Sequence, residues 1–309
     1  MENNWVSYKN GNYNVHLDLV SGTKIRENDL TFFKADRPEN MDIKITNKCN
    51  MGCAFCHENS TCDGKHSDAL NSKFLETLPE WTECAYGGGN VLEYPDFVPL
   101  LRKSKNLHLI SNITVNQKHF MENLSLLREL SNQKLIYGLG ISLTNPYEEG
   151  FIAAVKTFSN AVIHVINGVV TLAQLSALGC KDLKVLILGY KEVRRGVAYK
   201  ADVDHMVEFR KNRLYASLPF IAEHNWFKTI SFDNLALEQL EPKRFLSDEF
   251  YQTHNLGDDG LMGEQTSASY YVDLVENVFA RNSCDVNHRY PLENHTATEC
   301  YQLLRDNKI

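Results

Sequence analysis

The chain is predicted to be an α/β protein in which short strands and amphipathic helices alternate. Six short, apolar and mostly β-branched segments have the composition of buried parallel strands. Five segments with apolar residues at helical spacing lie between and after them. A cysteine-containing loop directly follows the first strand, and βα-loops are the segments that carry function in barrels. These observations predict βα units around one parallel sheet.

The predicted strands cover residues 41–46, 83–86, 107–115, 135–143, 161–166 and 183–188. The predicted helices cover residues 71–78, 95–103, 117–131, 146–158 and 171–178, with proline suited to the first turn at Pro95 and Pro146. Alternating segments at 14–19 and 30–33 predict a small β element before the sheet. Later segments predict a helix at 202–214, a strand at 229–233, a turn at 257–260 and an amphipathic segment at 270–280.

Composition limits the possible classes of protein. The 309 residues are enough for one large domain, or for one domain with appendages. Eight cysteines without regular pairing, no signal peptide and no apolar run of membrane length predict a protein of the reducing cytoplasm, without a membrane partner. A formal charge of −7 argues against a protein that coats nucleic acid, although it leaves room for a local basic patch.

Three cysteines, Cys49, Cys53 and Cys56, lie in the stretch Cys-Asn-Met-Gly-Cys-Ala-Phe-Cys. Three thiolates on one loop can hold three corners of an iron–sulfur cubane and leave the fourth iron open to another ligand. The alternative is a structural zinc site with His57, Cys62 or His66 as the fourth ligand. Because the spacing is not that of a paired zinc knuckle, it favours iron–sulfur chemistry.

A second feature follows about thirty residues later, where a short predicted strand ends in Gly87, Gly88, Gly89 and Asn90. Glycines at the end of a strand let a ligand approach the backbone closely. Alone, the run would be read as a generic glycine turn. Its position after the cysteine loop makes a ligand site the better interpretation.

The cysteines, with Phe55 before the last of them, form the pattern CxxxCxΦC, which resembles the signature of the radical S-adenosylmethionine (radical SAM) superfamily. The resemblance covers about residues 41–190. It implies a partial (β/α)6 TIM-like barrel, with residues 1–40 as an N-terminal β element and residues 191–309 as a C-terminal α+β extension covering the barrel mouth. It also implies a [4Fe-4S] cluster and SAM as cofactors, and an external electron donor resembling flavodoxin or ferredoxin.

In that family the open iron binds the methionine end of SAM, and the reduced cluster splits SAM to give a 5′-deoxyadenosyl radical that takes hydrogen from the substrate. The resemblance places the glycine run beside the amino group of SAM, with Asn90 in place of the usual glutamate. Polar residues at later strand ends, Asn116, Ser142 and Asn167, are expected to contact the ribose or carboxylate of SAM. Helix capping or turn formation is the alternative for each.

Two features of the sequence bear on the substrate. A basic stretch at 181–200 predicts phosphate or carboxylate contacts from Lys191, Arg194 and Arg195, and a solvated loop is the alternative. Residues 56–61 and 64–66 resemble stand-alone radical SAM proteins often carried by phages. Some of these act in thymidine hypermodification of DNA, including isomerisation of a glycyl group on the base.

A modified nucleobase in DNA or a nucleotide is therefore the expected substrate. The alternative is maturation of a ribosomal peptide, which is weakened because the tail lacks the cysteine-rich extension of many such enzymes and has only Cys284 and Cys300. An auxiliary cluster is not expected, since iron–sulfur sites normally need about four cysteine ligands. A zinc-stabilised binding module is the non-enzymatic alternative. His57, Glu58 and Lys65 are expected to be substrate contacts, surface residues or partners of the cluster ligands.

Overall fold

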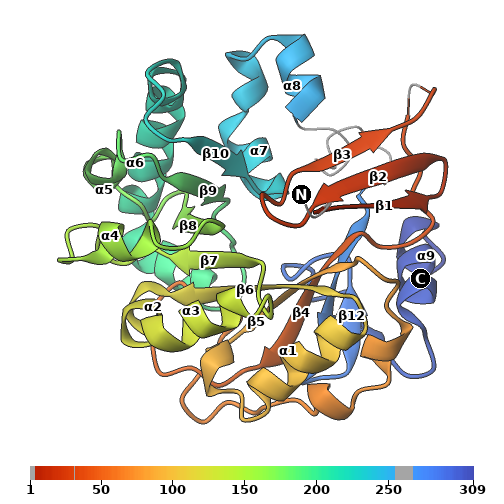
Figure 1. Ribbon diagram of the computed structural model, residues 1–309. Coiled ribbons are helices and arrows are strands. Elements are labelled where there is room, and N and C mark those ends of the chain that lie inside the picture. Colours follow the sequence, from red (N-terminus) through yellow and green to blue (C-terminus); the bar gives the residue numbers. More distant parts are fainter. Residues whose placement is uncertain (1–3, 31, 255–266) are drawn as a thin grey trace.

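The computed structural model describes residues 4–30, 32–254 and 267–309. Within these residues the strands form two sheets (Figure 1). The smaller sheet is antiparallel and has β2 (Tyr13–Asp18) between β1 (Trp5–Asn10) and β3 (Lys24–Glu27). The larger sheet has ten strands in the order β10-β9-β8-β7-β6-β5-β4-β11-β12-β13. Its strands are β4 (Asn40–Thr46), β5 (Glu83–Gly88), β6 (Ile110–Asn116), β7 (Gly138–Ser142), β8 (Ala161–Ile166), β9 (Lys184–Leu188), β10 (Thr229–Phe232), β11 (Ser269–Asp273), β12 (Val278–Ala280) and β13 (Tyr290–Pro291).

The large sheet confirms the predicted α/β class. The six predicted strands are β4 to β9, and each pairs in parallel with the next one along the chain. Two strands from the predicted C-terminal extension lengthen the parallel part, β10 beside β9 and β11 beside β4. In the described part of the chain no strand pairing closes the sheet on itself. The partial (β/α)6 barrel therefore remains an interpretation.

Nine α-helices occur in the described residues, and α1 to α5 lie between or after the parallel strands, as the alternating pattern predicts. Figure 1 shows α1, α2 and α3 together on one side of strands β4 to β7. The helices are α1 (Phe97–Asn106), α2 (Gln117–Glu122), α3 (Leu124–Asn132), α4 (Phe151–Val155), α5 (Leu172–Leu178), α6 (Arg195–Glu223), α7 (Asn234–Leu240), α8 (Asp248–His254) and α9 (Ala297–Arg305).

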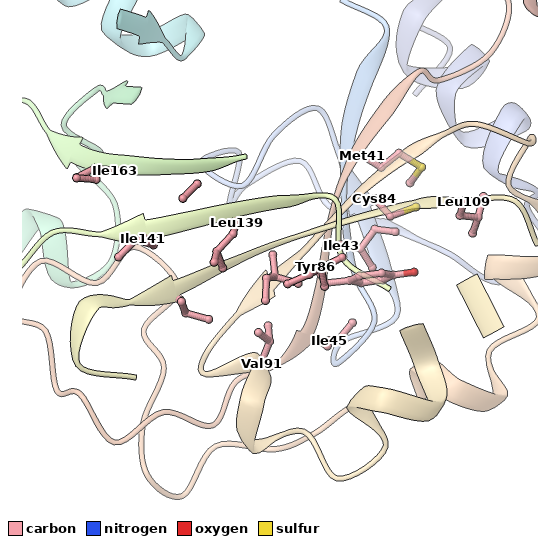
Figure 2. Packing of buried hydrophobic residues seen from close by; sticks show 14 of the residues in the cluster. Met41, Ile43, Ile45, Cys84, Tyr86, Val91, Leu109, Leu139, Ile141 and Ile163 are labelled. Carbon is pink, nitrogen blue, oxygen red and sulfur yellow. The ribbon is translucent and has the colours of Figure 1, made fainter. Parts of the chain in front are cut away.

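The two faces of the large sheet differ because successive side chains of a strand point to opposite faces. One face carries the core, in which Ile43, Tyr86 and Ile141 are almost fully buried (Figure 2). Burial of each such side chain contributes about 1.5–3 kcal/mol. Along β4 the residues that alternate with this core are Asp42 and Lys44. The sheet therefore has an apolar, helix-covered face and a polar face, and the polar face leads to the cysteine loop.

The predicted helix at 71–78 is wrong. The segment instead forms two 3₁₀ turns, η1 (Ala69–Asn71) and η2 (Phe74–Thr77), separated by an extended Ser72. Lys103 on α1 contacts the point where the segment breaks. Its ammonium group donates hydrogen bonds to the carbonyl oxygens of Leu70 and Ser72 at 3.0 and 3.3 Å. This contact holds the segment in its two separate turns.

Other predicted segments are shorter or divided. The segment at 117–131 forms α2 and α3 because Asn123 leaves helical geometry and bonds back to the His119 carbonyl at 2.8 Å. The helix predicted at 146–158 begins only at Phe151, after a left-handed Gly150. The helix predicted at 202–214 is part of the longer α6, and the segment at 270–280 contains β11 and β12 instead of one element.

The N-terminal β element is confirmed for residues 14–19, which overlap β2, but the described residues at 30–33 form no strand. There Asn28 holds a turn instead, because its side chain accepts from the Leu30 backbone and donates to the Phe32 carbonyl. The predicted turn at 257–260 lies outside the described residues.

Buried charges join the small sheet to the large one. Glu39, just before β4, is fully buried and accepts from Arg26 Nε and Tyr13 while it pairs with Lys24 at 3.3 Å. Lys24 also pairs with Glu83, the first residue of β5, at 2.6 Å. Burial alone raises the pKa of Glu39, but the charges of Lys24 and Arg26 outweigh it and lower the pKa. The carboxylate is thus ionised and fully partnered.

We predict that Glu39→Gln lowers the free energy of unfolding by about 3–5 kcal/mol at neutral pH, because it removes the buried negative charge that Lys24 and Arg26 share. Since the folded-state pKa of Glu39 is lowered, its contribution is present above the unfolded pKa and lost as pH falls through the folded pKa. Urea unfolding at several pH values measures both effects. Glu27→Gln is the control, because this exposed partner of His16 should contribute less than about 1 kcal/mol. Equal effects of the two substitutions would contradict the predicted role of Glu39.

Candidate cofactor site at the carboxyl ends of β4 and β5

The three cysteines lie on one folded loop, residues 47–61, which we call the cysteine loop. It starts where β4 ends and returns on itself, since Cys49 N donates to the Thr61 carbonyl at 2.8 Å and Thr61 N donates to the Asn47 carbonyl at 3.1 Å. A tight turn brings Cys56 N to the Cys53 carbonyl at 3.2 Å. The backbone thus fixes the loop at the carboxyl edge of the sheet.

The thiols of Cys49, Cys53 and Cys56 are half-buried and free, whereas Cys62 is exposed. Burial raises the pKa of the Cys49 and Cys53 thiols, and the nearby Cys56 thiol adds to the rise in both. The three groups therefore lie within electrostatic range of one another. They remain partly accessible from outside the protein.

The donor set fits an iron–sulfur cluster better than a single zinc ion. Across the described residues, no three His, Cys, Asp or Glu side chains converge as ligands of one metal ion. A zinc site needs its thiolates about 2.3 Å from one centre. In an iron–sulfur cluster each thiolate binds its own iron, so three half-buried thiols on one loop suit that group.

The glycine run at the end of β5 packs against the start of the cysteine loop. Gly88 has a φ of +105°, and a Cβ there would lie 2.2 Å from the Thr46 carbonyl oxygen. A Cβ on Gly89 would lie 2.1 Å from the Lys48 carbonyl oxygen. Gly87 differs, because a Cβ there would have no described atom within 4 Å. Gly88 and Gly89 thus permit close backbone packing, and Gly87 leaves open space on the polar face beside Lys44.

Asn90, which follows the glycines, is used in local structure. Its side-chain oxygen accepts from Leu92 N at 3.2 Å and caps the 3₁₀ turn η3 (Val91–Glu93). Its amide nitrogen donates to Glu93 Oε1 at 3.0 Å. The charge of Glu93 reaches Cys49, where it raises the thiol pKa. This role of Glu93 was not predicted from the sequence. Its position three residues after Asn90 is the only signal in the sequence for their contact.

Two of the three predicted strand-end residues are neighbours. Asn116 ends β6 and Ser142 ends β7, and the two are paired in the sheet. Asn116 caps α2, since its side-chain oxygen accepts from Lys118 N at 2.9 Å, and this capping was the alternative given for it. Asn167 is fully buried one strand further on and donates to Gln239 Oε1 at 3.0 Å. Its own side-chain oxygen has no partner among the described residues.

The basic residues of the 181–200 stretch are divided between two places. Arg195 donates to the Cys53 carbonyl at 3.0 Å, to Asn59 Oδ1 at 3.0 Å and to the Ser60 carbonyl. Arg194 donates to the His57 carbonyl at 2.9 Å. Both arginine side chains thus bind the cysteine loop through hydrogen bonds.

Lys191 donates to Ser283 Oγ at 3.1 Å, and its charge reaches His57 on the cysteine loop, where burial and this charge lower the pKa of the imidazole. Phe55, the aromatic residue of the cysteine loop, contacts the ring of Tyr199 on α6 edge-on, with centroids 5.6 Å apart. The start of α6 therefore packs on the loop through both polar and aromatic contacts.

A buried ionic network lies beneath the loop. Lys44 Nζ is 3.1 Å from both Glu58 Oε2 and Asp273 Oδ2, and all three side chains are almost fully buried. Tyr271 donates to Glu58 at 3.2 Å, and Arg289 pairs with Asp273 at 3.5 Å. We call these five residues the buried network. The sequence carries no local signal for it, because its members come from distant segments.

Burial and nearby charges set the protonation states of two residues on the cysteine loop. Burial raises the pKa of Glu58, but the charge and hydrogen bond of Lys44 and the charge of Arg194 act against it, and the pKa is lowered. Burial and the charge of Lys191 lower the pKa of His57 to about 3. The loop therefore presents a neutral imidazole and an ionised, partnered carboxylate at neutral pH.

No family model matches the chain, and no curated protein matches it. Solved structures share its fold. A structure of Streptococcus suis SuiB bound to precursor peptide SuiA has a TM-score of 0.60 and 12% identity, covering 98% of this chain and 88% of that one. SuiB bound to S-adenosylmethionine gives 0.58 and 12%, with 99% and 88% covered. Polyhistidine-tagged anSMEcpe with bound AdoMet gives 0.50 and 14%, with 88% and 79% covered. The chain therefore has the fold of these proteins, a mixed α/β fold with a large parallel sheet.

The glycine geometry predicts different effects at neighbouring positions. Gly87→Val should leave the cysteine loop intact, because its side chain enters open space, and should weaken binding of the SAM that the sequence resemblance implies. Gly88→Val should disturb the loop itself, because its side chain meets the Thr46 carbonyl at a positive φ. Iron content and equilibrium SAM binding of the reconstituted proteins measure the two effects. Unchanged SAM affinity in Gly87→Val would remove this space from the ligand site.

Proposed function

We propose that the protein is a radical SAM enzyme. The observation that supports the proposal is that three half-buried thiols lie on the loop that follows β4, and that the start of this loop packs against the glycine run at the end of β5. Two of the fold neighbours are described with bound SAM or AdoMet, the ligand that the sequence resemblance implied independently. In the described residues no helix is both long and apolar enough to cross a membrane.

The residues have distinct proposed roles. Cys49, Cys53 and Cys56 would hold a [4Fe-4S] cluster, whose chemistry when bound is one-electron reduction of SAM to release a carbon radical. Gly87 leaves room for the methionine end of SAM. Asn116, Ser142 and Asn167 remain proposed contacts to the rest of SAM, although the first and last already have partners within the fold.

The barrel, the electron donor and the cellular location are also proposals. The parallel strands β4 to β9 are interpreted as the partial (β/α)6 barrel, with residues 1–40, 41–190 and 191–309 as its three divisions. An external donor resembling flavodoxin or ferredoxin would supply the electron. A cytoplasmic location is proposed from the composition and the expected oxygen sensitivity of the cluster.

For the substrate, we propose a peptide. One fold neighbour is described as bound to its precursor peptide. The arginines expected to bind phosphate are instead occupied by the cysteine loop, which leaves Lys191 as the remaining proposed substrate contact of that set. The DNA or nucleotide substrate, the phage resemblance and the isomerase chemistry have no support from the comparisons and stay predictions from the sequence.

The metal is tested by anaerobic reconstitution. The wild-type protein should turn brown with about four irons and four sulfides per chain, the content of one [4Fe-4S] cluster. Replacing Cys49, Cys53 and Cys56 with Ala should abolish this, whereas Cys62→Ala, at an exposed thiol outside the loop, should not. With dithionite and SAM, the wild-type protein should form 5′-deoxyadenosine. A colourless protein holding one zinc ion would refute the proposal.

The substrate class is tested by comparing a peptide with DNA. A short peptide encoded next to this gene should change in mass when co-expressed with the wild-type protein, and not when co-expressed with Cys53→Ala. Labelled thymidine-containing DNA should show no specific binding. If DNA instead binds with an affinity that falls steeply between about 50 and 200 mM salt, phosphate contacts are present and the nucleic-acid substrate is favoured.

A further inference from the structure

One guanidinium group spans the cysteine loop. Arg195 Nη1 donates to the carbonyl oxygen of Cys53 at 3.0 Å, Nε donates to Asn59 Oδ1 at 3.0 Å, and Nη2 donates to the Ser60 carbonyl. The planar fork of arginine is suited to such a pattern, because its donors have fixed relative directions. A single side chain therefore ties the middle of the loop to its end.

The charge of this group is not neutralised by a carboxylate. In the part of the chain that the structure describes, no Asp or Glu lies within ion-pair distance of Arg195, and all three of its acceptors are neutral oxygens. Arg194 is different, because its Nη1 lies 3.4 Å from Glu58 Oε2. Two adjacent arginines thus contact the same loop, one with a paired charge and one without.

The backbone that presents these arginines is unusual. Arg194 has a φ of +49°, a region that residues other than glycine rarely occupy, and α6 begins at Arg195 directly after it. Such strain persists where the surroundings hold a residue firmly and is concentrated at functional sites. Here the strained residue lets consecutive side chains both reach the cysteine loop.

From these observations we infer that Arg195 is a positioning residue for the cluster, fixing the cysteine loop and placing an unpaired positive charge beside Cys53. This rests on the proposed function. Reduction adds one negative charge to an iron–sulfur cluster, so a nearby cation stabilises the reduced form more than the oxidised form. Arg195 therefore raises the reduction potential and slows the loss of iron. It is not a substrate contact.

The test compares three variants of the reconstituted full-length protein with the wild type. The reduction potential is measured by EPR-monitored titration, and the rate of iron loss is measured with a chelator. Arg195→Gln should lower the potential and speed iron loss, because it removes both the charge and the fork. Arg195→Lys should keep the potential near that of the wild type but lose iron faster, since it retains the charge alone. Arg194→Gln should shift the potential less than Arg195→Gln.

Each outcome decides the inference. An unchanged potential in Arg195→Gln, or an equal shift in Arg194→Gln, overturns it. If Arg195→Gln holds no cluster, Arg195→Lys decides: a cluster of wild-type potential that loses iron faster supports the inference, and one that loses iron at the wild-type rate overturns it. A wild-type protein that takes up no iron would refute the proposed function itself, which distinguishes that failure from a failure of the inference.

Discussion

The buried ion pairs of Lys44 with Glu58 and Asp273 are the constraint on which the site depends. Lys44 lies on β4, Glu58 on the cysteine loop and Asp273 on β11, so one ammonium group joins the central sheet, the loop and the C-terminal part of the chain. Removing one member of a buried pair leaves a buried charge unpaired and costs about 3–5 kcal/mol. The conformation of the cysteine loop is therefore coupled to the folding of distant segments.

The cysteine loop is held from two further directions. The glycines after β5 allow the Gly89 and Asn90 amides to donate to the Thr46 and Lys48 carbonyls at 2.8 Å, which fixes the start of the loop. The start of α6 holds the middle and end of the loop through the side chains of its first turn. The cysteine loop is therefore held at its start, middle and end, while its thiols stay partly accessible. This suits a centre that must bind iron, receive an electron and admit a ligand.

The features that could be predicted from the sequence are those formed by residues close together in the chain. The cysteine spacing, the glycine run and the apolar strands each lie within about ten residues, so their consequences were visible without a structure. The buried network was not visible, since Lys44 and Asp273 are far apart in the chain and neither has a distinctive neighbour. Arg194 and Arg195 were noticed, but a basic run does not reveal its acceptor, and here the acceptors are mainly backbone carbonyls of the loop. The failed helix at 71–78 has the same cause, because Lys103 from another element donates to the Leu70 and Ser72 carbonyls, and this contact has no local signal in the sequence.

The central claim is that three thiols hold a cluster with one iron open toward Gly87. EPR spectra of the reduced, reconstituted protein with and without SAM test it most directly, because a ligand at an iron changes the signal of the cluster. We predict a [4Fe-4S] signal whose g values shift on addition of SAM. A signal unaffected by saturating SAM, or the absence of any cluster signal after reconstitution, would contradict the claim.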